Sequence, residues 1–211
     1  MRVPAAAPAA VLAALLVTAG CLGVVTGSEA LTGEADRAAV NQATVGESGY
    51  ELAAEEEQTL EREVTVAGQT RQMEATNKLT RYERSFDVPG AGTVKAGVFA
   101  VVSTPSFSVA GQALNPVGRL SNDELIERVG SSYEGLSVGE AVDERSVSTL
   151  GSVMNVTKYE GIATIGGVEV DVYVHVGSVR AGEDFVVVTA VYPQLIDDED
   201  TVLRFVRNLR H

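Results

Sequence analysis

Two stretches decide the fold: Val156–Ile165, VTKYEGIATI, and Val168–Val179, VEVDVYVHVGSV. Gly166-Gly167 separates them, and a two-glycine loop readily supplies the positive φ angles of a tight hairpin turn. Every second residue from Val168 to Val176 is valine, and this period of two is typical of a β-strand. The sequence therefore predicts an antiparallel hairpin with the valines on one face and polar side chains on the other.

Further strands are expected on both sides of this hairpin. The alternating or β-branched stretches are 50–56, 59–66, 71–82, Val94–Val102 and Phe185–Tyr192. Val94–Val102 is apolar on both faces, which predicts a central strand covered on both sides. Glu51–Glu63 also contains good helix formers, so a helix stays open as an alternative there. Pro105–Pro116 is expected to be a loop without regular structure.

The clearest helix signal begins at Ser121. Glu124 follows three residues later, which makes a capping box, and Leu120 and Leu125 occupy the hydrophobic staple positions. Because Gly130 is a favoured helix end, the sequence predicts a helix over 121–130.

A second helix is predicted near the C-terminus, over 198–210. Acidic residues crowd its start and arginines its end, which is the charge order that the helix dipole favours. Its expected inner stripe is Val202, Phe205, Val206 and Leu209. Shorter helices are expected over 34–45 and 137–143. Together these elements predict one α+β domain over 34–211: an antiparallel β-sheet with a few helices packed on one face, including the C-terminal helix.

The start of the chain predicts export. Arg2 precedes an apolar stretch, Val3–Ala19, and small residues lead into Cys21. A basic start, an apolar middle and a small-residue end are typical of a signal peptide. A cysteine at this place predicts a lipobox: cleavage between Gly20 and Cys21, and a lipid on the Cys21 thiol.

The predicted organisation is therefore a signal peptide over 1–20, a lipid-anchored tether over 21–33 and the domain. A non-cleaved anchor and ordinary secretory cleavage stay as alternatives. Cys21 is the only cysteine, so no intramolecular disulfide can form. The expected location is the outer side of the cell membrane, with the membrane as partner through the lipid.

The chain is strongly acidic, with 29 acidic against 16 basic side chains and a net charge of −13. A general nucleic-acid-binding surface is excluded on this ground, because it requires basic patches. Repulsion between carboxylates is screened within about 3 Å at 1 M salt. The composition therefore favours adaptation to high salt. A merely acidic exported protein from a GC-rich genome is the alternative.

Residues with catalytic or ligand-binding chemistry are few. Asp171, Tyr173 and His175 alternate on the more polar face of the predicted hairpin, where they could form a ligand face or an acid–base site. A hydrogen-bonded or exposed strand histidine is the simpler interpretation. The acidic residues at 197–200 could attract a hard cation, but they also suit a helix start. No catalytic residue, metal site or cofactor is assigned. Asn155-Val156-Thr157 is a candidate glycosylation sequence.

Taken together, several segments resemble those of uncharacterised haloarchaeal lipoproteins. They are the lipobox, Thr104-Pro105, Asn115-Pro116, Leu120-Ser121-x-x-Glu124-Leu125, Val170–Val176 and Glu183-Asp184-Phe185. The resemblance implies an exported, lipid-anchored protein whose domain has no assigned function. At the level of architecture, a sheet with a terminal helix is also similar to the fold of extrinsic photosystem subunits and Ran-binding proteins, which implies no activity.

Three functions are compatible with these observations. The first is a non-enzymatic surface module that binds a protein or a small ligand. The second is an extracytoplasmic hydrolase-like enzyme that uses Asp171, Tyr173 and His175, and the third is a structural component of the envelope. A cavity that joins the three side chains would favour the enzyme.

Overall fold

The computed structural model describes residues 30–66, 68–88, 92–109, 112–133, 135–165, 167–196 and 198–211. The predicted signal peptide over 1–20, the lipidation site Cys21 and most of the tether therefore lie outside the described residues. The last part of the predicted tether is strand β1 (Leu31–Glu34) rather than irregular chain.

Strands make up most of the described chain. In order they are β1, β2 (Ala39–Val40), β3 (Glu51–Val66), β4 (Gln69–Val88), β5 (Gly92–Pro105), β6 (Ser108–Val109), β7 (Gln112–Ala113), β8 (Leu136–Thr149), β9 (Ser152–Ile165), β10 (Val168–Ala181), β11 (Asp184–Pro193) and β12 (Leu209–Arg210). Within the described residues, eight strands form one sheet in the order β1-β4-β5-β11-β10-β9-β8, and β3 pairs with β4. The other four form two small two-stranded ladders, β12-β2 and β6-β7.

The predicted hairpin is confirmed as β9 and β10. They pair in antiparallel register from Val168 opposite Ile165 to Gly177 opposite Val156. Gly167 has a φ of +84°, the left-handed conformation that a glycine adopts at little cost. On its other edge β10 pairs with β11, and β11 pairs with β5. The predicted strands Val94–Val102 and Phe185–Tyr192 are thus central to the sheet.

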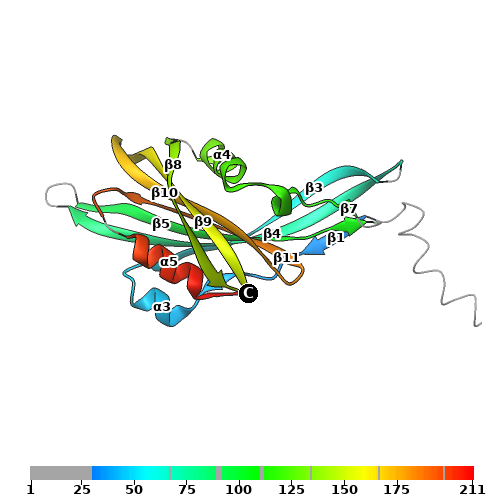
Figure 1. Cartoon of the computed structure of the whole chain (residues 1–211), viewed down its shortest axis with the longest axis horizontal. Helices are drawn as coiled ribbons and strands as arrows, with labels where there is room; N and C mark the ends of the chain where they lie inside the picture. Colours follow the sequence, from blue (N-terminus) through cyan, green and yellow to red (C-terminus); the bar gives the residue numbers. More distant parts are fainter. Residues whose placement is uncertain are drawn as a thin grey trace, which may run out of the picture. The chain divides into compact units, whose positions relative to one another are not determined.

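Both faces of the central strands are covered, each by a different helix (Figure 1). Helix α5 (Glu199–Arg207) packs with the side chains of Val186, Val188, Ala190 and Tyr192. Helix α4 (Asn122–Ser132) packs with Val172, Val174 and Val176, and with Val187 and Val191. Successive side chains of a strand point to opposite faces. The even-numbered side chains of β11 therefore pack in the core with α5, and the odd-numbered ones pack in the core with α4. The "α4 face" and "α5 face" below are these two faces.

The predicted fold class is wrong. The protein is a β-rich fold, with three short α-helices among its described residues, and these helices do not lie on one face of the sheet. The predicted helix over 137–143 belongs to β8. Of the predicted helix over 34–45 only the last part is helical, in α3 (Gln42–Gly46), and Ala39–Val40 is strand β2. Hydrogen bonds to β9 place Leu136–Thr149 in the sheet although glycine and acidic residues interrupt its apolar pattern.

The capped helix is confirmed. Ser121 accepts a hydrogen bond from the Glu124 backbone N–H at 3.2 Å, and the Glu124 carboxylate accepts one from the Ser121 N–H at 2.8 Å. Leu125 and Ile126 are buried against the sheet, as the pattern predicts. The predicted loop 105–116 is only partly irregular, because β6 and β7 pair within it. A short 3-10 turn, η1 (Pro116–Arg119), follows before α4.

The core on the α5 face is centred on the ring of Phe205. Its centroid lies 5.1 Å from that of Phe99, 5.3 Å from Tyr50 and 6.0 Å from Tyr82, all in edge-to-face contact. The predicted stripe of α5 and the chain that follows it is confirmed: Val202, Phe205, Val206 and Leu209 are buried. This cluster joins α5 to β4 and β5.

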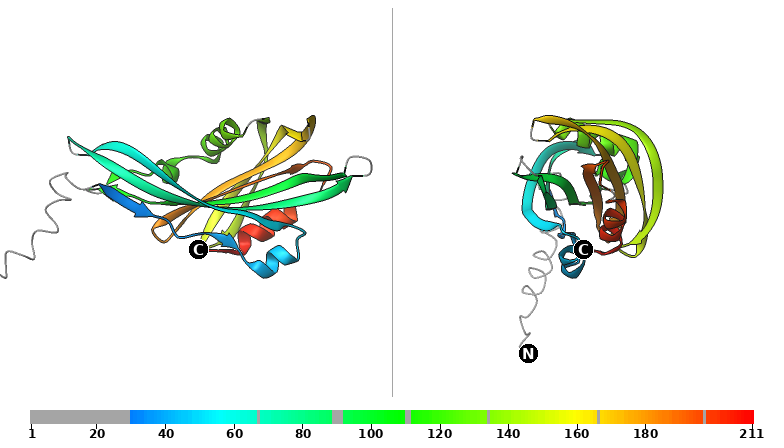
Figure 2. Two further views of the ribbon diagram at one scale, coloured as in Figure 1. Left: turned by 180° about the vertical axis from the view of Figure 1, so that it is seen from behind. Right: turned by 90° about the vertical axis from the view of Figure 1, so that its left-hand side faces the viewer.

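Strands β3 and β4 are much longer than predicted and form one hairpin, which Figure 2 shows from two sides. The part of this hairpin at Leu60–Glu74, with residues 30–32, forms a compact unit of its own. In that unit the hydroxyls of Thr65 and Thr70 lie 3.2 Å apart near the turn at Gly68. The remaining described residues form the larger unit, which contains every site discussed below.

Candidate functional site

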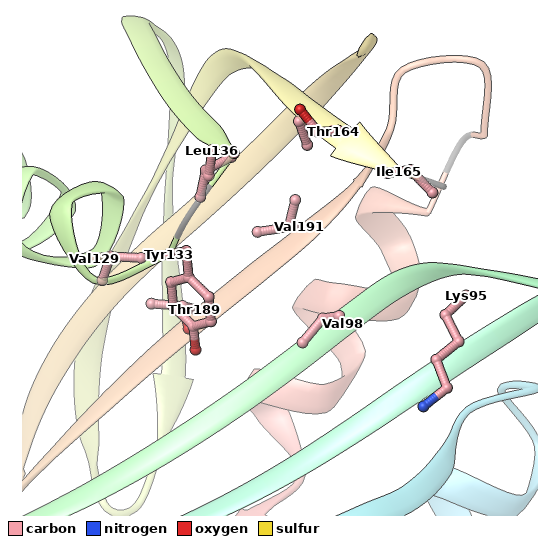
Figure 3. A pocket seen from close by; sticks show the side chains of 11 residues that line it. Lys95, Val98, Val129, Tyr133, Leu136, Thr164, Ile165, Thr189 and Val191 are labelled. Carbon is pink, nitrogen blue, oxygen red and sulfur yellow. The ribbon is translucent and has the colours of Figure 1, made fainter. Parts of the chain in front are cut away.

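An apolar cavity of about 220 Å³ opens on the α4 face, beside the C-terminal end of α4 (Figure 3). Four segments that are distant in the sequence contribute to its wall. The lining residues are Lys95 and Val98 of β5, Val129 of α4, Tyr133, Gly135 and Leu136 next to it, Ala163, Thr164 and Ile165 of β9, and Thr189 and Val191 of β11. We call this space the α4 cavity.

The cavity exists because α4 is too short to cover its whole face of the sheet. Leu125 and Ile126 bury the valines of β10, but the helix ends at Ser132. Beyond that point the apolar surface continues over Val98 and Val191, which lie opposite each other on β5 and β11. Tyr133 and Leu136 cover this surface only from one side, so a hollow remains.

The wall of the α4 cavity is mostly apolar. Its one charged lining residue, Lys95, forms an ion pair with Glu83 and stands at the border of the group in Figure 3. The hydroxyl groups of Thr164 and Thr189 are the side-chain hydrogen-bonding groups contributed by β9 and β11. Ligand sites are commonly apolar hollows with a few polar groups that fix the orientation of the ligand.

The three predicted ligand-face residues differ in solvent exposure in the structure. Asp171 is exposed, Tyr173 is partly buried and His175 is only 2 % exposed. Lys158 places its ammonium 3.8 Å from the centroid of the Tyr173 ring and binds Glu199 at 2.7 Å. None of the three lines the α4 cavity or the two polar cavities described below.

His175 is instead part of the core on the α5 face. Its Nε2 lies 2.9 Å from the hydroxyl of Tyr192, and the two rings are stacked with centroids 5.5 Å apart. Burial lowers the pKa of His175 from 6.5 to about 4, although the negative charge of Glu199 acts in the opposite direction. The imidazole is therefore neutral near pH 7 and serves as a hydrogen-bonded packing group.

Two of the acidic residues at the start of α5, Asp198 and Glu199, are bound to basic side chains. Asp198 accepts hydrogen bonds from the Tyr50 hydroxyl at 2.7 Å and from Arg84 Nη1 at 2.9 Å. Glu199 binds Lys158. Asp197 lies outside the described residues. Among the residues that are described, no three acidic, histidine or cysteine side chains are grouped as metal ligands would be. The carboxylates of Asp198 and Glu199 therefore hold the start of α5 against the sheet.

Two polar cavities, of about 570 and 600 Å³, lie between α4 and β8 and share Asp123 and Ala141. The Tyr159 hydroxyl donates a hydrogen bond to Asp123 at 2.7 Å, and Asn122 Nδ2 donates one to Thr157 Oγ1 at 2.8 Å. Burial, together with the bond to Asp123, raises the pKa of Tyr159. These contacts fix the first turn of α4 to β9.

The candidate glycosylation sequence lies in β9, at the wall of one of these polar cavities. Asn155 is exposed and accepts a hydrogen bond from Ser146 at 2.8 Å, whereas Thr157 is buried. Glycosylation of Asn155 stays a prediction, which the intact mass of the native protein decides.

Sequence reasoning missed the α4 cavity and the role of Tyr192. Tyr192 has the same parity as the buried Val186, Val188 and Ala190, and this pattern could have placed it in the core. The cavity has no comparable signal, because its wall depends on where α4 ends and on how four segments meet.

No helix among the described residues combines the length and the apolar character that a membrane span requires. No curated protein matches the chain. One family model does match, over residues 37–210, which is most of the chain. The chain therefore belongs to the family described as a domain of unknown function, DUF6517.

Proposed function

We propose that this protein is a lipid-anchored lipoprotein of the cell surface, with a non-enzymatic binding module adapted to high salt. The observation that carries the binding role is the α4 cavity, an apolar hollow on the α4 face of the sheet. His175 is buried and its imidazole is neutral near pH 7, so it offers no accessible acid or base, and the exposed Asp171 lines none of the cavities described above. The binding module is therefore the better candidate.

The proposed anchor rests on the residues at the start of the chain. The apolar stretch Val3–Ala19 and the small residues before Cys21 support export and lipidation, as does the resemblance to haloarchaeal lipoproteins. Export of this kind would place the domain outside the cell, held at the membrane by the lipid.

Replacing Cys21 by serine should abolish incorporation of labelled lipid and release the protein from membranes. The physical reason is that a hydroxyl cannot form the thioether that joins the lipid to the chain. Membrane fractionation and intact mass of wild type and Cys21→Ser check this. Unchanged membrane partitioning of the variant, or an unmodified thiol in the native protein, would contradict the anchor.

The proposed adaptation to high salt is supported by the charge of β3. This strand contains six glutamates, and its side chains are exposed along nearly its whole length. Glu57 binds Arg37 at 3.3 Å and Lys78 at 3.4 Å, but the neighbouring Glu56 has no ion pair among the described contacts. Repulsion among such carboxylates extends about 10 Å at 0.1 M salt and about 3 Å at 1 M.

Thermal unfolding should therefore shift to lower temperature when KCl is reduced from 3 M to 0.1 M. Glu56→Gln should raise the low-salt midpoint by about 1 to 2 °C, because it removes one unpaired charge from the strand. Glu57→Gln is the matched control and should give no gain, since it also removes two ion pairs. A midpoint that does not change with salt would refute the adaptation.

The binding role is tested by filling the cavity. Ala163→Leu places a larger side chain in the wall, whereas Ala53→Leu makes the same change at an exposed position of β3. Small molecules are expected to co-purify with the protein from native membranes in high salt. Their amount per protein should be at least about 10-fold lower for Ala163→Leu. Ala53→Leu should retain them. Equal retention by both variants would refute the role of the cavity.

A further inference from the structure

We infer that the α4 cavity takes a neutral molecule of about one ring, aromatic or branched, with at most one hydrogen-bonding group. This inference rests on the proposed binding function and specifies the ligand of that same cavity. Its size, its charge and the chemistry of its wall each support it.

The size of the cavity limits the ligand. A dry apolar cavity of about 150 Å³ binds benzene, and sites for drug-sized molecules occupy about 300 to 1,000 Å³. The α4 cavity, at about 220 Å³, lies between these values. It therefore accommodates a single substituted ring, and two fused rings would exceed the room that it offers.

The charges around the cavity favour a neutral ligand. Lys95 is the one charged residue of its wall, and its ammonium already binds the Glu83 carboxylate. An anionic ligand would have to compete with Glu83 or enter the apolar wall without a counter-charge. Transfer of an unpaired charge into such surroundings is strongly unfavourable.

The wall also explains why a ring suits the cavity. Tyr133 is 46 % exposed and stands where α4 gives way to β8, so its ring can cover one side of a bound ligand (Figure 3). Aromatic rings contact one another best edge to face or offset. Thr189 can offer a hydroxyl to one polar group, such as a phenol hydroxyl.

Salt should strengthen this binding. Screening weakens attraction between charges, whereas salts that are excluded from protein surfaces favour apolar burial. A neutral ring should consequently bind at least as tightly in 3 M as in 0.5 M KCl. A ligand held by Lys95 would bind more weakly as salt rises.

The experiment titrates the full mature chain in 3 M KCl with four probes: toluene, phenol, benzoate and naphthalene. Binding is followed by the methyl NMR signals of Val98, Val129 and Val191, which line the cavity. We expect toluene and phenol to shift these signals, and benzoate to bind at least about 100-fold more weakly. Ala163→Leu should lower the affinity for toluene at least about 10-fold, and Ala53→Leu should leave that affinity unchanged.

A second variant keeps the test decisive if Ala163→Leu does not fold. Val191→Ala enlarges the cavity, so naphthalene should gain affinity relative to toluene. Benzoate binding as tight as toluene, failure of both rings to shift the three methyl signals, or no change of probe preference in Val191→Ala would overturn the inference. Loss of a chemically different native ligand in Ala163→Leu would uphold the proposed function and refute only the ligand class.

Discussion

Replacing Phe205 by alanine should lower the free energy of unfolding by about 4 kcal/mol. Phe205 is fully buried, and its ring contacts Tyr50, Tyr82 and Phe99 in edge-to-face geometry. Its removal loses the burial of a large side chain and leaves a void that neighbouring rings fill only in part. Because these three rings belong to other elements, the loss also loosens α5 from the sheet.

Urea unfolding at constant KCl measures this effect, since urea does not change the ionic strength. Leu195→Ala is a suitable control, because Leu195 is 96 % exposed and its truncation should change the free energy by less than about 0.5 kcal/mol. A loss below about 1 kcal/mol in Phe205→Ala would mean that α5 is not held by this aromatic cluster.

Acidification should destabilise the protein through His175 by about 3 kcal/mol between pH 7 and pH 4. In the unfolded chain the imidazole takes up a proton near pH 6.5, whereas burial holds the pKa of His175 in the folded protein at about 4. Over the pH range between the two values the unfolded state binds one more proton. Stability is thus fully present above pH 6.5 and falls by about 1.36 kcal/mol per pH unit towards pH 4.

His175→Gln removes this titration and keeps a side chain that can hydrogen-bond to Tyr192. Urea unfolding of both proteins from pH 7 to pH 4 measures the difference, and the carboxylates that titrate in both proteins cancel from it. The wild type should lose about 3 kcal/mol more than the variant. Parallel pH profiles would show that His175 is accessible to protons in the folded state.

The parts of the fold that were predictable are those with strong local signals. The glycine turn and alternating valines of β9 and β10, and the capping box at Ser121, each depend on residues near one another in the chain. β8 was not predictable in this way, because glycine and acidic residues interrupt its pattern and hydrogen bonds to β9 determine its conformation. The fold class was wrong for the same reason, as long strands extend beyond the alternating stretches.

The site was less predictable than the fold. Asp171, Tyr173 and His175 lie on one face of β10, as the period of two predicts, but the periodicity of one strand does not indicate what covers that face. α5 covers that face at His175 and leaves Asp171 exposed. The α4 cavity depends on the last turn of one helix and on side chains of β5, β9 and β11, so no single stretch of sequence contains it.

The stacking of His175 on Tyr192 has a consequence for how β10 finds its place in the sheet. A one-residue slip of β10 would exchange its two sets of side chains between the faces. Both faces are apolar at this point, so valine burial alone distinguishes weakly between the native and the slipped alignments. The slip would also deprive a buried imidazole of its only described partner, and an unsatisfied buried polar group costs about 1 to 3 kcal/mol. The hydrogen bond between His175 and Tyr192 should therefore help to fix the register of β10 in the sheet.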